Sequence, residues 1–223
     1  MLIQTVSLTK TYTINSDIET PALRGVDLTI EKGEFTAIAG PSGSGKTSLL
    51  NLIGALDKPS SGSIFYEGKD ITQIAISQLA LFRLKEIGFV FQAYNLINTL
   101  TAFENVEYVM LLQKVPVSIR RKKTSEILNR VGLGEYINRF PNQMSGGQQQ
   151  RVAVARSIVA EPKVILADEP TANLDSKTAE SLLDLMRQLN QEKGVTFIFS
   201  THDKMVMDKS RRLVMLHDGK VIN

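Results

Sequence analysis

The sequence has no cysteine, which excludes a disulfide framework, thiolate metal sites and a thiol nucleophile. It has no tryptophan, and aromatic residues make up only 6% of its 223 residues, so the core must rest on Leu, Ile, Val and Ala. Low-complexity tracts are missing, which excludes disordered, collagen-like and coiled-coil proteins. No apolar run approaches the roughly 20 residues that span a bilayer, and the first residues lack the pattern of a signal peptide. We therefore expect a cytosolic protein that reaches a membrane only through a partner.

Positive and negative charges are nearly balanced. Lys and Arg number 26 and Asp and Glu 23, which leaves a formal net charge of +3. The pI near 9.0 overstates this excess, because two histidines and no cysteine leave few groups that titrate near neutral pH. A nucleic-acid-binding protein usually concentrates basic residues on one face. A net charge this small neither requires nor excludes such a face.

Short apolar or β-branched runs alternate with helical patterns along most of the chain. Strands are predicted at residues 2–9, 22–30, 35–39, 63–67, 69–71, 87–91, 164–167, 195–200, 213–216 and 220–222. Helices are predicted at residues 46–56, 103–114, 119–131, 146–160, 177–192 and 203–209, with Ser118 as an N-cap candidate. This alternation predicts an α/β fold with a mostly parallel sheet and helices on both faces. The helical stretch at 101–139 interrupts it and is expected to form a subdomain.

A glycine-rich loop between a predicted strand and a predicted helix matches the phosphate-binding pattern G-x-x-x-x-G-K-[ST]. Its glycines let backbone N–H groups turn inward toward phosphate oxygens, at the positive end of a helix dipole. Lys46 would reach the β- and γ-phosphates, and the Thr47 hydroxyl would bind Mg²⁺. The alternative is a loop whose glycines serve only the turn; the strand–loop–helix order favours a phosphate site. The expected nucleotide contacts are Gly40, Pro41, Ser42, Gly43, Ser44, Gly45, Lys46, Thr47 and Ser48.

An acidic pair follows the apolar strand predicted at 164–167. Ligands of open α/β sheets bind at the carboxyl ends of strands, where Asp168 would hold Mg²⁺ and Glu169 would polarise a water toward the γ-phosphate. Taken alone, Asp168 and Glu169 are more typical of a helix start before Pro170 than of a catalytic site. The presence of the phosphate loop reverses that preference and predicts a nucleoside triphosphatase of unspecified kind.

The string Met144-Ser-Gly-Gly-Gln-Gln-Gln-Arg151 distinguishes among such enzymes. It resembles the signature motif of ATP-binding-cassette (ABC) ATPases, which other P-loop enzymes lack, although Met144 replaces the usual leucine. A serine and two glycines at a helix N-terminus make an anion site free of side-chain obstruction. The resemblance implies that Ser145, Gly146, Gly147 and Gln148 face the ATP of a second subunit.

Four further positions match the family pattern. Gln92 resembles the glutamine that touches Mg²⁺ and the attacking water and reports to the membrane partner. Asp175 resembles the loop residue at the dimer interface, and it could equally cap the helix that follows. His202 resembles the switch histidine that contacts the γ-phosphate. Tyr12 resembles the aromatic residue that stacks on adenine; the alternative is an ordinary edge-strand tyrosine.

The resemblance runs from Leu2 to Ile222 and implies a P-loop NTPase (RecA-like) core, an N-terminal antiparallel β subdomain and an inserted α-helical subdomain. We expect one domain, 1–223, with a core at 1–92 and 160–223 and a helical subdomain at about 93–159. The distance between the phosphate loop and the signature motif is too short for the coiled coil of chromosome-maintenance and repair ATPases. We likewise expect no regulatory domain of the kind found in sugar-import ATPases.

A finer resemblance places the chain near lipoprotein-releasing and macrolide-export cassettes, on the residues 51–59 and 87–106. It implies an ATPase that binds ATP and Mg²⁺, forms a homodimer when ATP-bound, and powers a separate integral membrane permease. The expected location is peripheral, on the cytoplasmic face of the cell membrane, with no nucleic-acid partner. A related cell-division ATPase suggests the alternative, a nucleotide-gated regulatory module that transports nothing. The sequence leaves both open, because all the catalytic residues are present.

Overall fold

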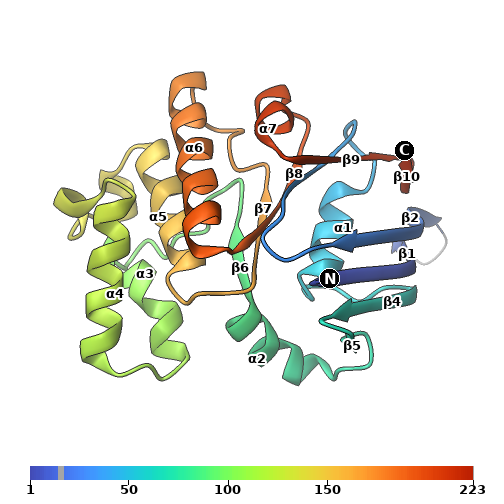
Figure 1. Ribbon diagram of the computed structural model, residues 1–223, viewed down its shortest axis with the longest axis horizontal. Helices are drawn as coiled ribbons and strands as arrows, with labels where there is room; N and C mark the ends of the chain where they lie inside the picture. Colours follow the sequence, from blue (N-terminus) through green and yellow to red (C-terminus); the bar gives the residue numbers. More distant parts are fainter. Residues whose placement is uncertain (15–17, 223) are drawn as a thin grey trace. The chain divides into compact units, whose positions relative to one another are not determined.

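A computed structural model describes residues 1–14 and 18–222 of the chain. These residues form two compact units. Unit 1 comprises 1–83 and 196–223, and unit 2 comprises 84–195. Figure 1 shows the strands of the antiparallel sheet in unit 1 and the helices α3 to α6 in unit 2. Within the described residues, no helix has both the length and the apolar character needed to cross a membrane.

An antiparallel sheet opens unit 1, with strand order β2-β1-β4-β5. Its members are β1 (Ile3–Ile14), β2 (Ile18–Ile30), β4 (Ser61–Tyr66) and β5 (Lys69–Asp70). The first two strands are longer than the predicted 2–9 and 22–30, because their pairing continues through Thr11↔Pro21 and Tyr12↔Thr20. The alternation Thr11-Tyr12-Thr13 suits such a pairing, since β-branched and aromatic residues pack well on a pleated surface.

A second set of strands in unit 1 surrounds β3 (Phe35–Ala39), which is buried along its whole length. It pairs in parallel with β8 (Thr196–Thr201) and β9 (Arg212–His217), while β10 (Lys220–Ile222) is antiparallel to β9. The rings of Phe35, Phe197 and Phe199 cluster in the core, with centroids 4.7–5.9 Å apart. Unit 1 also contains the helices α1 (Lys46–Ile53) and α7 (Lys204–Lys209) and most of α2 (Ile76–Glu86).

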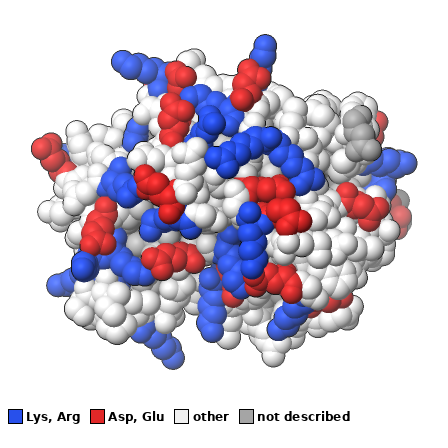
Figure 2. Space-filling model, in the orientation of Figure 1, with Lys and Arg blue, Asp and Glu red and all other residues white. Residues whose placement is uncertain are grey.

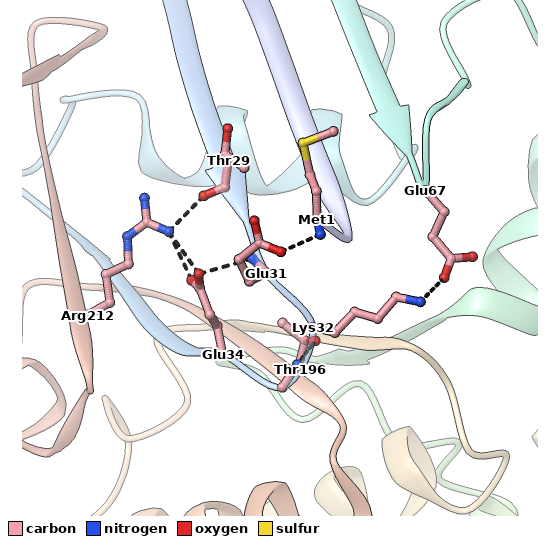
Figure 3. A network of polar contacts seen from close by, with 9 residues as sticks. Met1, Thr29, Glu31, Lys32, Glu34, Glu67, Thr196 and Arg212 are labelled. Carbon is pink, nitrogen blue, oxygen red and sulfur yellow. Dashed lines mark hydrogen bonds and ion pairs between the residues drawn. The ribbon is translucent and has the colours of Figure 1, made fainter.

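A polar network fastens β9 to the turn that joins β2 to β3 (Figure 3). Nη1 of Arg212 donates to the carbonyl of Thr29 at 2.7 Å and to both carboxylate oxygens of Glu34 at 3.0 Å. The same carboxylate accepts the backbone N–H of Glu31 at 3.0 Å. Both carboxylate oxygens of Glu34 therefore have a donor, which helps to fix where β3 begins.

Unit 2 contains one parallel strand pair and most of the helices. The pair is β6 (Ile87–Val90) with β7 (Val164–Asp168). The helices are α3 (Ala102–Leu112), α4 (Val117–Arg130), α5 (Gly146–Ile158) and α6 (Ser176–Lys193), with short 3₁₀ turns at Gly134–Tyr136 and Pro141–Gln143. Helix α2 (Ile76–Glu86) ends just before β6. On the face shown in Figure 2, acidic and basic side chains are interspersed.

Two details differ from the sequence-based expectations. Ser118 is not an N-cap: α4 begins at Val117 with Pro116 in the cap position and no side-chain cap. The carbonyl of Pro116 already accepts helical bonds from Ile119 and Arg120, which places Ser118 inside the first turn. Helix α2 was not predicted, because its eleven residues lack a strong apolar stripe and are not preceded by a capping motif.

Close backbone contact between β6 and α5 yields a stability prediction. A Cβ atom at Gly88 would lie 2.3 Å from the carbonyl oxygen of Ser157. Gly88→Ala should therefore lower the free energy of unfolding by about 1–3 kcal/mol, the usual cost of overpacking. Denaturant unfolding followed by circular dichroism measures it. Gly68→Asn is the control, because that turn position is open and asparagine tolerates its left-handed backbone; equal losses in both variants would contradict the packing argument.

Candidate active site

The predicted phosphate loop joins β3 to α1 in unit 1. Gly45 adopts a φ of 103° as the N-cap of α1, and no side chain caps this helix end. A Cβ at Gly45 would lie 2.4 Å from the carbonyl oxygen of Ala22, so only glycine fits. The buried Oγ of Ser44 lacks a hydrogen-bond partner in the described part of the chain. Uncapped amides and a buried hydroxyl are donors that an anion can satisfy.

Lys46 is folded back over this loop. Its side chain is only 7% exposed, and its Nζ donates to the carbonyls of Gly40 at 2.8 Å and Pro41 at 2.9 Å. Among the residues that the structure describes, it forms no ion pair with a carboxylate. A buried ammonium held only by neutral carbonyls is stabilised further by an anionic ligand. The loop therefore fits a polyphosphate.

Two other predicted residues lie near this loop in unit 1. The parallel register pairs Ala39 with Thr201, so Gly40 and His202 leave β3 and β8 at the same edge. His202 is exposed there. Tyr12 of β1 is 37% exposed, and its hydroxyl lies 3.4 Å from Oγ of Ser48 on α1. Unit 1 thus brings the phosphate loop, the histidine and the tyrosine into one neighbourhood.

The acidic pair and the glutamine lie at one edge of the strand pair in unit 2. The register pairs Val90 with Ala167, so Asp168, the last residue of β7, and Gln92, two residues after β6, lie at the carboxyl ends of these strands. Glu169 has a φ of 45°, a left-handed conformation that is costly for a residue with a side chain. Other non-glycine residues, such as Ser7 and Lys114, share this conformation, so the catalytic role of Glu169 stays a prediction.

The signature motif begins α5 with a reciprocal cap. Ser145 Oγ accepts the N–H of Gln148 at 3.3 Å, and the Gln148 side chain accepts the N–H of Ser145 at 2.9 Å. The glycines are also needed for packing: a Cβ at Gly146 would lie 2.7 Å from the Tyr94 hydroxyl, and one at Gly147 would lie 2.5 Å from Thr178. The motif is therefore consistent with a helix-capping role in this chain as well as with the predicted anion site.

Asp175 caps α6. Its carboxylate accepts the Thr178 hydroxyl at 2.6 Å and the Thr178 N–H at 3.0 Å. These side-chain and backbone hydrogen bonds hold the pKa of Asp175 below its ordinary value. The capping alternative for Asp175 is thus realised, and its place at a dimer interface stays a prediction.

Sequence reasoning missed a positioning residue for the segment after Gln92. Tyr94 and Asn95 have consecutive left-handed backbones, with φ of 60° and 48°. The guanidinium of Arg156, on α5, donates to both of their carbonyls, at 2.9 and 2.6 Å. Burial lowers the pKa of Arg156 from its ordinary value. No local sequence pattern indicates this role of Arg156, because the residue lies inside a helix and its partners are about sixty residues earlier in the chain.

This contact predicts a local effect of Arg156→Lys. A single ammonium cannot reproduce the planar fork that serves two carbonyls, so the unfolding free energy should fall by about 1–3 kcal/mol. Amide hydrogen exchange in the segment 92–97 should become faster, as measured by mass spectrometry. Arg151→Lys on the same helix is the control, because Arg151 bonds Val131 and Ser181 instead. Equal acceleration in both variants would contradict the role of Arg156.

The fold and the loop between β3 and α1 define a nucleotide-binding cassette, and comparison with known proteins identifies its family. The model of the ABC transporter family matches residues 23–172, and the chain belongs to this family. A dimeric ATP-binding cassette, solved in a post-hydrolysis state with ADP and Pi, matches with a TM-score of 0.92 and 42% identity, over 100% of this chain and 97% of that one. The predicted fold class and family are thereby confirmed.

The relatives also match the finer resemblance. Lipoprotein-releasing system ATP-binding protein LolD 1 of Rhodopseudomonas palustris is 46% identical over 95% of this chain and 94% of its own length. Macrolide export ATP-binding/permease protein MacB of Syntrophobacter fumaroxidans is 44% identical over 99% of this chain, which spans 31% of that longer protein. The chain therefore resembles both types that its sequence suggested.

Proposed function

We propose that this chain is the ATP-binding and ATP-hydrolysing subunit that powers a separate membrane subunit of an ABC transporter, in export, lipoprotein release or mechanical transmission. The observation that carries the proposal is the loop around Lys46, with a buried ammonium, an uncapped helix end and an orphaned hydroxyl, in a chain that matches a nucleotide-bound cassette along its whole length. Family membership supports the same function.

In this proposal, residues 40–48 hold the phosphates, with Lys46 on the β- and γ-phosphates, and Tyr12 stacks on the adenine. Glu169 takes a proton from a water whose oxygen attacks the γ-phosphorus, while the bond to ADP breaks. His202 contacts the γ-phosphate as its charge changes. Catalysis rests mainly on positioning and charge stabilisation.

Magnesium belongs to the same proposal. Thr47, Asp168 and Gln92 would hold Mg²⁺, since oxygen donors suit this hard cation. When bound, it neutralises phosphate charge. Within unit 1, Thr47 lies in the first turn of α1, and within unit 2, Asp168 and Gln92 lie at the carboxyl ends of β7 and β6, where strands of α/β sheets present ligand-binding residues.

The chain would work as a head-to-tail homodimer when ATP is bound, since a C₂ interface makes the two sites equivalent. Ser145, Gly146, Gly147 and Gln148 of one copy would face the ATP of the other, and Asp175 would lie at the interface. The dimeric cassette structures support this arrangement. The division into a core at 1–92 and 160–223 and a helical subdomain at about 93–159 is retained as part of the proposal.

A surface in unit 2 supports a membrane partner. The end of α3, the following turn and the start of α4 expose an apolar surface, formed by Tyr108, Leu111, Leu112, Val117 and Ile119. Tyr108, Leu111 and Leu112 fall at helical spacing on α3, and exposed apolar side chains grouped in this way indicate an interaction site. A cytoplasmic segment of the permease would cover this apolar surface and hold the chain at the inner face of the cell membrane.

Glu169→Gln tests the enzymatic part. Loss of a general base should lower ATP turnover by about 10²–10⁴-fold and leave ATP binding intact, measured as phosphate release and by isothermal titration. Lys46→Ala should instead abolish ATP binding. A Glu169→Gln variant that hydrolyses ATP at the wild-type rate would refute the assignment of Glu169.

A pull-down tests the partner. Tagged Glu169→Gln protein, with ATP and Mg²⁺, should recover a membrane subunit with a large extracytoplasmic domain from detergent-solubilised native membranes, identified by mass spectrometry. Replacing Leu111 and Leu112 by serine should abolish recovery by removing apolar contact area. Leu213→Ser, at an equally exposed leucine in unit 1, should not. Recovery of cell-division proteins would favour a regulatory module, and an empty membrane fraction would argue against transport.

A further inference from the structure

Lys10 and Asp57 form an ion pair beside Tyr12, the residue that the proposed function stacks on the adenine. Lys10 and Tyr12 lie two residues apart on β1, and side chains at that spacing share a face of a strand. Nζ of Lys10 lies 2.7 Å from Oδ2 of Asp57, in the segment after α1. It also lies 4.9 Å from the centroid of the Tyr12 ring, in cation–π geometry.

Lys10 has little freedom to act on anything else. Its side chain is only 12% exposed, and Nζ also donates to the carbonyl of Lys58 at 2.8 Å. Carboxylate, carbonyl and ring thus offer a partner for each of its three N–H donors. Lys10 is therefore poorly placed to contact phosphate, in contrast to Lys46.

The tyrosine is held at its edge as well as on one face. Its hydroxyl donates to Oδ2 of Asp57 at 3.3 Å and lies 3.4 Å from Oγ of Ser48, on the helix that begins with Lys46. Partial burial raises the pKa of Asp57, but hydrogen bonds from Lys10 and the Lys58 N–H outweigh it, so the pKa lies below its ordinary value. The carboxylate stays charged near neutral pH and keeps both contacts.

The geometry points to Lys10 and Asp57 as positioning residues for nucleotide binding: the pair fixes the Tyr12 ring against α1, covers one of its faces, and presents the other to the adenine base. This inference rests on the proposed role of Tyr12. With Lys10 on one face and Asp57 and Ser48 at the hydroxyl edge, the 37% of Tyr12 that is exposed is the surface left for stacking. The pair thereby sets the spacing between the base and the phosphate loop.

The test separates base binding from phosphate binding. Titration calorimetry of Lys10→Met and Asp57→Asn with ADP should give affinities about 5- to 20-fold weaker than wild type, a part of what one stacked base contributes. Their affinities for inorganic pyrophosphate should equal the wild-type value. Lys32→Met is the control, because Lys32 forms an ion pair of similar length with Glu67, at 2.6 Å, elsewhere in unit 1 and with a more exposed side chain; this variant should bind both ligands normally.

A second comparison shows whether Lys10 acts through the ring. In a Tyr12→Ala background, Lys10→Met should cause no further loss of ADP affinity. Lys10→Arg should retain near-wild-type ADP affinity, since arginine also pairs with a carboxylate and stacks on a ring, and this variant serves if Lys10→Met does not fold.

Three results would overturn the inference: unchanged ADP affinity, an equal loss for pyrophosphate, or an additive loss in the Tyr12→Ala background. Failure of the proposed function has a different signature, because the wild-type protein would then bind neither ADP nor pyrophosphate.

Discussion

Parallel strand pairing is the constraint on which every candidate catalytic residue depends. In unit 1, the pairing of β3 with β8 brings the phosphate loop and His202 to one edge. In unit 2, the pairing of β6 with β7 does the same for Gln92 and the acidic pair. A slip of one residue in either register would turn the flanking side chains to the opposite face and displace the loops that follow. The strands β3, β7 and β8 are buried and rich in Val, Ile and Phe, and the burial of these side chains stabilises the register.

Two cations, the buried Lys46 and the partly buried Arg156, use the same kind of hydrogen bond for different purposes. Lys46 and Arg156 both bond to backbone carbonyls rather than to carboxylates. The Lys46 carbonyls belong to the phosphate loop, where an incoming anion would compete for the ammonium. The Arg156 carbonyls belong to a left-handed segment, which is also held by the hydrogen bond from Asn173 to the carbonyl of Gln92. One cation is thus kept ready for a ligand, and the other is a permanent part of the backbone scaffold.

The sequence allowed the motifs to be predicted because each is a local string placed between recognisable elements. The phosphate loop, the Asp168-Glu169 pair and the signature helix fall where the patterns placed them. What escaped prediction depends on distant partners: Arg156 acts on a segment about sixty residues earlier, and Lys10 meets Asp57 across nearly fifty. The N-cap at Ser118 failed for a local reason, because Pro116 had already begun the helix. Periodicity predicts elements well, but it carries no information about which side chains meet.

The caps of α5 and α6 give the two helix ends different electrical characters. Asp175 places a full negative charge at the N-terminus of α6, which offsets the positive end of that helix dipole. Ser145 satisfies the corresponding amide of α5 with a neutral hydroxyl. An aspartate at that position would cap α5 equally well and would leave its stability intact. The choice of serine therefore leaves the positive end of the α5 dipole without the negative charge that offsets it at α6.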